Sequence, residues 1–253
     1  MKQDPVSVHP SKTQVIFFRR AEDEERTVSL ARDVLGQDTP SFSVHFASFG
    51  QTISAPVTIP AKATGMMLTS RAALSSLPAT TLPIHCVGPS TAKACQEAGF
   101  TTGIVGKGSL RSLADKLIKN GVTGVLFHPH GEVVNQQHYP LLEQAGLKVM
   151  PKCAYRVRKS KKLSIKPLGQ QGADRLPLWC VFSVAAALHL DKLLSQSGLQ
   201  GKRHAVVLTP QVAAALSHWD KVLVSQNPQL ESLLTKVKTY LHEQQSQQKT
   251  NTG

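Results

Sequence analysis

The segment VGPSTAKACQEAGF, residues 87–100, places two hydroxyl side chains where a helix is expected to begin. A short apolar run leads into Gly88, and Ser90 and Thr91 then open a helical pattern. The first turn of a helix carries unpaired N–H groups and a partial positive charge, so hydroxyls there can help to bind a carboxylate. The alternative is ordinary helix capping, which needs only one of the two hydroxyls.

Serines also follow two other apolar runs. Ser70 comes directly after MMLT, which ends in Thr69, and Ser183 comes directly after WCVF. Each serine could cap a following helix, and capping alone would explain it. Each could equally add a hydroxyl to an anion-binding site at the end of a strand.

The motif HPHG, which ends in Gly131, brings His128 and His130 to the end of another apolar run. Two histidines so close could share a metal ion, but we find no third ligand at a suitable spacing. The four cysteines form no CxxC pair and lie mostly in apolar runs. We therefore predict reduced thiols and no metal or redox site.

The formal net charge is +13, while only 5% of the residues are aromatic. The basic residues are spread along most of the chain, with the densest run at residues 156–162, which is either a solvated linker or a functional segment. No aromatic residues interleave with them as on a nucleic-acid stacking surface. The charge could equally attract a small polyanion, and we expect no specific nucleic acid as partner. No apolar run suits a membrane helix or a signal peptide, so we expect a cytoplasmic protein that needs no membrane.

Short apolar runs alternate with amphipathic helical patterns along the whole chain. This alternation predicts parallel sheets with crossover helices. The predicted strands in the first part are residues 15–18, 66–69, 84–87, 103–105, 125–127 and 147–150. The helices between them are residues 22–35, a helix from Ser70, a helix after 87, residues 109–119 and residues 135–145.

The second half of the chain repeats the first. LTSRAALSSL at 68–77 is similar to VFSVAAALHL at 181–190, and VGPSTAKAC is similar to LTPQVAAAL at 208–216. The unit that contains HPHG has no counterpart at the end of the second half. Its pattern appears instead at the N-terminus, in VIFFRRAEDEERTVSLARDVLG. One repeat is therefore split between the two ends of the chain.

We predict two similar parallel-sheet, flavodoxin-like α/β domains joined by a two-stranded linker, one of them discontinuous. Ligands of such sheets bind beyond the carboxyl ends of the strands, so a site is expected in a cleft between the domains. The predicted parts are a discontinuous domain (1–40 and 166–253), a continuous domain (51–150), antiparallel linker strands (41–50 and 151–165) and a disordered tail (243–253).

The order and spacing of LTSRAAL, VGPSTAKACQEAGF, VLFHPHGE, CAYRV, VFSVAAAL and LTPQVAAAL resembles that of the uroporphyrinogen-III synthases, over residues 15–241. The resemblance implies a cofactor-free lyase of tetrapyrrole and haem biosynthesis. Such an enzyme converts linear hydroxymethylbilane into uroporphyrinogen III, with loss of water and inversion of ring D. We expect a monomer that receives this polycarboxylate from hydroxymethylbilane synthase.

The resemblance gives two residues more specific roles. Tyr155 in CAYRV matches a tyrosine at the start of the family's return linker, where a phenol could donate a proton to the departing hydroxyl. The alternative is a linker tyrosine that packs its ring on a domain. Arg19 matches an arginine of the first strand-to-helix turn and could pair with a substrate carboxylate, or be simply solvated. Arg20 stands where proline is more usual.

The repeat and the resemblance together imply a set of substrate-binding residues at the predicted strand ends. Its members are Arg19, Thr69, Ser70, Gly88, Ser90, Thr91, His130, Gly131, Ser183, Thr209 and Gln211.

Two positions depart from the family pattern. His130 stands where the family often has arginine, which leaves only a titratable charge. In TPQV, Gln211 and Val212 replace a hydroxyl pair, and Val212 has no group that donates. We therefore keep two alternatives to an active synthase. One is a synthase-like protein that binds a tetrapyrrole or another polyanion without turnover, and the other is a nonspecific nucleic-acid binder.

Overall fold

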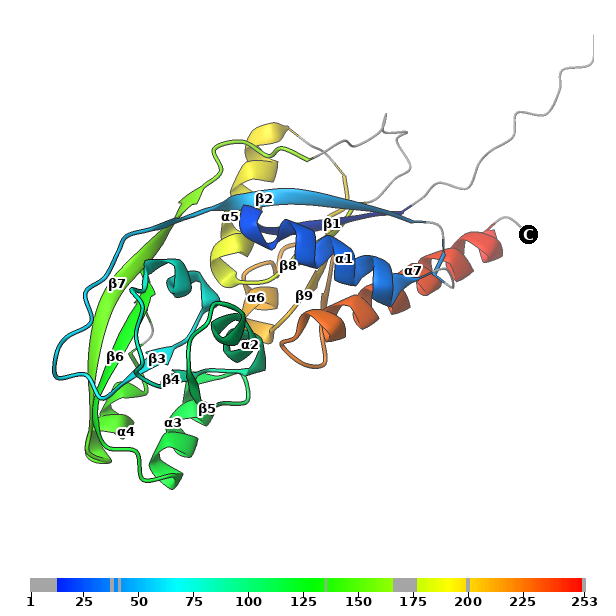
Figure 1. The fold of residues 1–253 in the computed structure, drawn as a ribbon. Helices are drawn as coiled ribbons and strands as arrows, with labels where there is room; N and C mark the ends of the chain where they lie inside the picture. The colour runs from blue at the N-terminus through cyan, green and yellow to red at the C-terminus, as the bar shows by residue number, and fades with distance from the viewer. Residues whose placement is uncertain are drawn as a thin grey trace, which may run out of the picture. The chain divides into compact units, whose positions relative to one another are not determined.

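The computed structural model describes residues 13–36, 39–40, 42–134, 136–165, 177–198 and 201–251. The chain divides into two compact units, unit 1 from residues 1–51 with 159–253, and unit 2 from residues 52–158 (Figure 1). In both units the strands pair in parallel and are connected by helices. The predicted α/β class with parallel strands is confirmed.

The sheet of unit 1 has helices on both faces. Its strands follow in the spatial order β2 (Phe42–Ser54), β1 (Thr13–Arg20), β8 (Pro177–Val181), β9 (His204–Val207) and β10 (Lys221–Val224). The helices α1 (Glu24–Leu35) and α7 (Leu230–Asn251) cover one face, and α5 (Val184–Ser197) and α6 (Pro210–Ala214) cover the other (Figure 1). A 3-10 turn, η1 (Ala21–Asp23), precedes α1.

The run VIFF of β1 shows why unit 1 is covered on both faces. Successive side chains of a strand point to opposite faces, so a strand buried on both sides is apolar throughout. Val15 and Phe17 belong to a core cluster with residues of α1 and α7. Phe18 points the other way and stacks against His189 of α5, with ring centroids 6.4 Å apart.

Unit 2 is built in the same manner. Its strands follow in the order β7 (Leu147–Lys159), β6 (Gly124–Gly131), β3 (Gly65–Leu68), β4 (Ile84–Cys86) and β5 (Thr102–Val105). One core cluster joins the sheet to the 3-10 helix η2 (Arg71–Ser76) and to α2 (Pro89–Glu97). A second cluster joins it to α3 (Leu110–Lys119) and α4 (Tyr139–Gln144).

The two strand orders correspond position by position. In unit 1, β2 and β1 lie on one side of β8, and β9 and β10 on the other. In unit 2, β7 and β6 lie on one side of β3, and β4 and β5 on the other. The strand order therefore reverses between β1 and β8 in unit 1, and between β6 and β3 in unit 2.

The chain passes from one unit to the other after residue 51, within β2, and after residue 158, within β7. The second crossing lies inside the segment 151–165 predicted as a linker strand, and the first lies just beyond the predicted segment 41–50. Within unit 1, Ser160 N–H donates to Phe49 O over 3.0 Å, and Ala47 forms an antiparallel bridge with Ile165. Within unit 2, Ala55 N–H donates to Ala154 O over 2.9 Å. The two crossing segments therefore contact each other inside each unit.

Three helices differ from the sequence prediction. The helix after Ser70 is a single 3-10 segment. The helix predicted at 135–145 is shorter, because Pro140 fits only the first turn and fixes the start at Tyr139. The predicted tail at 243–253 is helical as far as Asn251, since its Gln, Glu and Lys residues favour helix and no glycine or proline interrupts it. Residues 252 and 253 lie outside the described residues.

Among the helices that the structure describes, none combines the length and apolar character needed to cross a membrane.

The turn from β1 into α1 contains a nearly buried carboxylate. Asp23, with 3% of its side chain exposed, accepts from Arg20 Nε at 3.3 Å and lies 3.7 Å from Arg19 Nη2. Removing one partner of a buried ion pair leaves uncompensated charge. We expect Asp23→Ala to lower the free energy of unfolding by about 2–3 kcal/mol. Urea titration measures this, with the exposed Asp33→Ala on the same helix as the control. Equal effects of the two substitutions would contradict the prediction.

Candidate functional site

The carboxyl ends of the parallel strands form one edge of the sheet in each unit. Several of the substrate-binding residues predicted from the sequence lie at this edge. Ligands of such sheets bind at this edge, where the strand order reverses. In unit 2 the strand order reverses between β3 and β6. Thr69 and Ser70 directly follow β3, and β6 ends in His130 and Gly131. In unit 1 the corresponding end of β1 is occupied by Arg19.

Tyr155 and Gly131 are paired residues of β7 and β6. A Cβ atom added to Gly131 would lie 2.9 Å from Cε2 and Cζ of Tyr155 and 3.1 Å from its hydroxyl oxygen. The phenol ring therefore rests directly against the glycine backbone. The tyrosine is half-buried and packs against the core cluster of unit 2. Its ring therefore packs on a domain, as the alternative interpretation expects, while the residue also lies beside the end of β6.

A hydrogen-bonded chain of three side chains lies beside this pair. Thr69 Oγ1 is 3.1 Å from Nε2 of His128, and Nδ1 of His128 is 2.5 Å from the Tyr139 hydroxyl. His128 is fully buried. Burial, and next the charge of His130, lower the pKa of His128 to about 3, and burial raises the pKa of Tyr139 to about 12. Both groups are therefore neutral around pH 7.

The low pKa of His128 predicts a loss of stability in mild acid. The folded-state pKa of about 3 lies below the usual 6.5, so between these values the unfolded chain binds a proton that the folded chain does not. Stability is therefore complete above about pH 6.5 and falls by about 1.4 kcal/mol per pH unit below it. We expect the free energy of unfolding to be about 2 kcal/mol lower at pH 5 than at pH 7.5 from this group alone.

Urea titrations across this pH range check the prediction. His128→Gln serves as the comparison, because it removes the titrating ring while the other histidines remain. The difference in pH slope between the two proteins isolates His128. Identical slopes would contradict the assignment.

His130 also lies at this edge, and its ring is 5.4 Å from that of His128. Its Nδ1 is 2.6 Å from Gly131 O. A carbonyl oxygen only accepts, so Nδ1 must carry the proton, and a neutral ring then presents an accepting Nε2. His130 can donate to a carboxylate from Nε2 only as an imidazolium. Across the described residues, no three His, Cys, Asp or Glu side chains are grouped to hold a metal ion.

The Ser90 and Thr91 hydroxyls follow Gly88, the N-cap residue of α2. The N-cap position is thus held by a glycine, and neither hydroxyl side chain occupies it. Gly88 is required by packing, since a Cβ there would lie 3.0 Å from Gly108 Cα. Ser90 is exposed, whereas Thr91 retains only 8% exposure.

Ser70 and Ser183 both act as helix caps. Ser70 Oγ accepts from Ala72 N–H, and Ser183 Oγ accepts from Ala186 N–H, each over 3.2 Å. The capping interpretation therefore applies to both serines. It also shows that the two repeats place the same group at the same strand end.

Arg19 has partners within unit 1. Its Nη1 donates to Thr27 Oγ1 over 2.8 Å, and its guanidinium carbon lies 4.2 Å from the centroid of the Phe182 ring. With the nearby Asp23 carboxylate, these contacts hold the arginine at the end of β1. The alternative of a simply solvated arginine does not apply.

The α6 turn of unit 1 departs most from its repeat partner. Thr209 is the N-cap residue of α6 and makes no side-chain cap hydrogen bond. Gln211 is exposed, and Val212 is 2% exposed. The position that corresponds to Thr91 is thus an apolar side chain packed in the core.

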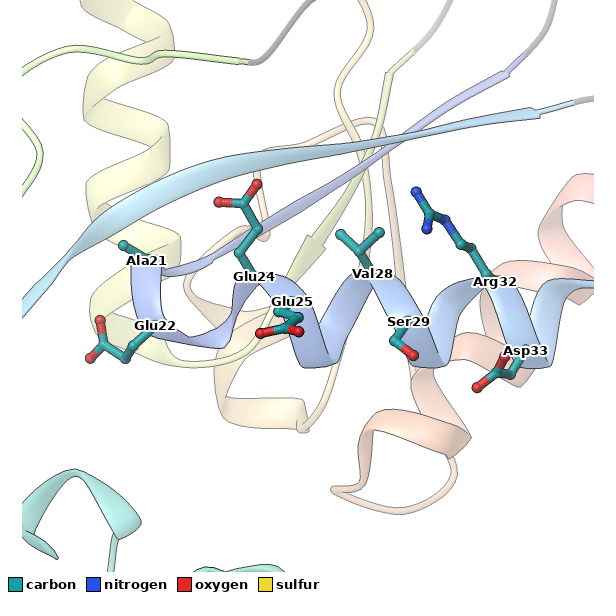
Figure 2. Close-up of a pocket in the computed structure, with 8 residues that line it drawn as sticks. All are labelled: Ala21, Glu22, Glu24, Glu25, Val28, Ser29, Arg32 and Asp33. Atoms are coloured by element: carbon teal, nitrogen blue, oxygen red, sulfur yellow. The ribbon is translucent and has the colours of Figure 1, made fainter.

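A surface hollow of about 800 Å³ lies elsewhere, along η1 and α1. Figure 2 shows its lining, which includes the acidic residues Glu22, Glu24, Glu25 and Asp33. None of the predicted site residues lines it. Because carboxylates repel carboxylates, this hollow does not suit an acidic substrate.

Sequence reasoning missed the roles of His128, Tyr139 and Asp23. The HPHG motif suggests a metal ligand at His128, whereas the position of His128 inside an apolar strand indicates a buried and therefore hydrogen-bonded ring. Tyr139 had no sequence signal that linked it to His128, because the contact depends on how α4 packs on the sheet.

Comparisons with known proteins found one matching family and several similar solved structures. The family described as uroporphyrinogen-III synthase HemD matches residues 39–235. Uroporphyrinogen-III synthetase from Helicobacter pylori is similar in structure, with a TM-score of 0.58, 13% identity, and coverage of 90% of this chain and 99% of that chain. The wild-type synthase from Thermus thermophilus gives a TM-score of 0.39 at 16% identity, covering 92% of this chain and 99% of that chain.

A search of curated proteins gave no match. At these identities the structural similarity to the Helicobacter pylori protein shows the fold alone. The family match covers most of the chain and agrees with the motif order. The chain belongs to the uroporphyrinogen-III synthase HemD family.

Proposed function

We propose that this protein is a uroporphyrinogen-III synthase that closes linear hydroxymethylbilane into uroporphyrinogen III with inversion of ring D. The observation that carries the proposal is the Tyr155 ring set against Gly131 at the carboxyl edge of unit 2. This contact supports the proposed role, because a phenol held against the backbone has the fixed position that a general acid needs.

In the proposed reaction, Tyr155 assists departure of the hydroxyl from the hydroxymethyl group, which leaves as water. The resulting azafulvene is electrophilic, and the substituted carbon of ring D attacks it to form a spiro intermediate. This intermediate fragments and closes again with ring D inverted. Uncatalysed closure gives the non-inverted isomer, so most of the catalysis is positioning of a flexible chain.

The substrate carries carboxylates on its acetate and propionate arms, and the protein has a net charge of +13. Hydroxyls and helix N–H groups at the strand ends suit such arms. We propose that the two units are flavodoxin-like domains that both contribute to substrate binding. Thr69, Thr91 and His130 would act from unit 2, and Arg19, Thr209 and Gln211 from unit 1. We also propose a monomer that acts after hydroxymethylbilane synthase.

The test is a coupled assay that generates hydroxymethylbilane with its synthase and separates the oxidised products by chromatography. We expect the type III isomer in excess over the uncatalysed reaction. Formation of only the type I isomer would overturn the proposal.

A second candidate is a synthase-like protein that binds a tetrapyrrole without turnover. The buried Val212 in place of a hydroxyl, and the His130 Nδ1 bound to Gly131 O, favour it. Uroporphyrin III binding, measured by fluorescence, together with type I product alone would support this candidate. Type III product would exclude it.

A further inference from the structure

The chain Thr69, His128 and Tyr139 is built at the point where the strand order of unit 2 reverses. Thr69 directly follows β3, His128 lies in β6, and Tyr139 begins α4 on the face of the sheet that α3 and α4 cover. Thr69 is half-buried, while His128 and Tyr139 are buried. The three side chains therefore run from the interior of unit 2 to its carboxyl edge.

We infer that His128 and Tyr139 are positioning residues that fix the Thr69 hydroxyl as a hydrogen-bond donor for a carboxylate of the substrate. The inference rests on the proposed function for the identity of the ligand. Which atom donates in each hydrogen bond of the chain follows from the hydrogen positions that the geometry allows.

The Tyr139 hydroxyl sets the direction of the chain. Within the described residues its side-chain partner is His128 Nδ1, at 2.5 Å. If Nδ1 carried the proton, the phenol hydrogen would be left buried without an acceptor from that contact, which is costly. Tyr139 O–H therefore donates to Nδ1, and the single proton of the neutral ring lies on Nε2.

That proton then determines what Thr69 can offer. Nε2–H donates to Thr69 Oγ1 over 3.1 Å, so the threonine oxygen is used as an acceptor on its inner side. Its own hydrogen is left to point outward. A carboxylate has only acceptors, and a hydroxyl held as a donor suits it. The opposite tautomer would turn the Thr69 hydrogen inward and present lone pairs to the carboxylate.

The protonation states keep this arrangement constant over the working pH range. Burial lowers the pKa of His128 to about 3, with a smaller contribution from His130, and burial raises the pKa of Tyr139 to about 12. Neither group changes charge near pH 7, so the Thr69 donor does not depend on a titration.

Unit 1 offers a matched control. His204 Nδ1 lies 2.6 Å from the hydroxyl of Tyr240, which is also buried. His204 is the first residue of β9 and so lies at the opposite, amino end of its strand. Tyr240→Phe removes the same kind of hydrogen bond away from the carboxyl edge.

The first test is long-range ¹H–¹⁵N NMR of the histidine-labelled protein, with His128 assigned by comparison with His128→Gln. We expect the tautomer protonated at Nε2. A ring protonated at Nδ1 would overturn the inference, whatever the protein's activity.

The second test measures binding of uroporphyrin III, a stable polycarboxylate, by fluorescence, and turnover where the protein is active. We expect Thr69→Val to weaken binding about ten-fold. We expect Tyr139→Phe to weaken binding about three- to ten-fold. In turnover the same variant should raise KM and change kcat by less than about two-fold. Tyr240→Phe should leave the dissociation constant unchanged.

The double variant decides between positioning and a general structural effect. Tyr139→Phe acts through Thr69, so it should add little in a Thr69→Val background. An equal loss in both backgrounds, or no loss from Thr69→Val, would overturn the inference. The wild-type product tests the proposed function separately, since type I isomer alone would overturn that function while the binding cycle still decides the role of Thr69.

Discussion

Tyr155→Phe is expected to lower kcat for uroporphyrinogen III formation by about 100-fold, because general acid assistance of this kind contributes two to four orders of magnitude. The phenylalanine ring keeps the packing against Gly131 and the core cluster. The free energy of unfolding should therefore change by less than about 1 kcal/mol. Steady-state kinetics in the coupled assay and urea titration measure the two quantities.

Tyr240→Phe is the control for Tyr155→Phe, because it removes a phenol hydroxyl from unit 1 that is buried and bonded to His204. It should cost stability and leave kcat unchanged. The opposite pattern, with a normal rate in Tyr155→Phe, would remove Tyr155 from the mechanism and leave it a packing residue.

Gly131→Ala is expected to lower kcat about ten- to thirty-fold by displacing the Tyr155 ring, since small misplacements of a reacting group are costly. The new methyl would lie 2.9 Å from two ring carbons, closer than they can tolerate. The contacted atoms are the far end of a side chain rather than backbone, so the ring can move. The free energy of unfolding should accordingly fall by only about 1 kcal/mol.

The double variant of Gly131→Ala with Tyr155→Ala tests whether the loss of activity comes from displacement of the Tyr155 ring. Without the ring, the added methyl has no partner to displace, and it should cause no further loss of activity. A Gly131→Ala effect of equal size in both backgrounds would mean that the glycine matters for the backbone or for substrate, and not for Tyr155.

The sequence alone was sufficient for the fold class and for the position of most strands. The apolar run VIFF of β1 and the run before Ser183 are buried on both faces, and such strands are apolar throughout. The predicted end of one helix at residue 35 and the predicted start of another at residue 109 agree with the structure to within one residue. Gly36 adopts the positive φ that follows a helix, and Ser109 caps a free N–H. The family followed from the order of motifs, which is itself a sequence property.

The helix boundaries that the sequence did not settle were those where local preferences compete. Pro140 shortened α4, since a proline inside the predicted helix had to become its first turn. The polar segment after 243 continued α7, because polarity does not distinguish an exposed helix from a tail.

For the candidate site too, some features could be predicted from the sequence and others depended on packing. Gly131 and Thr69 could be proposed from the sequence because they stand at predicted strand ends, whereas Tyr155 was implied only by the family resemblance. The contact of the Tyr155 ring with Gly131 depends on the register of β6 and β7, and the link from Tyr139 through His128 to Thr69 depends on packing of α4. The sequence therefore determined which groups stand at the strand ends. Only the tertiary structure decided which of them touch and in which direction their hydrogen bonds run, because residues far apart in the chain meet only through packing.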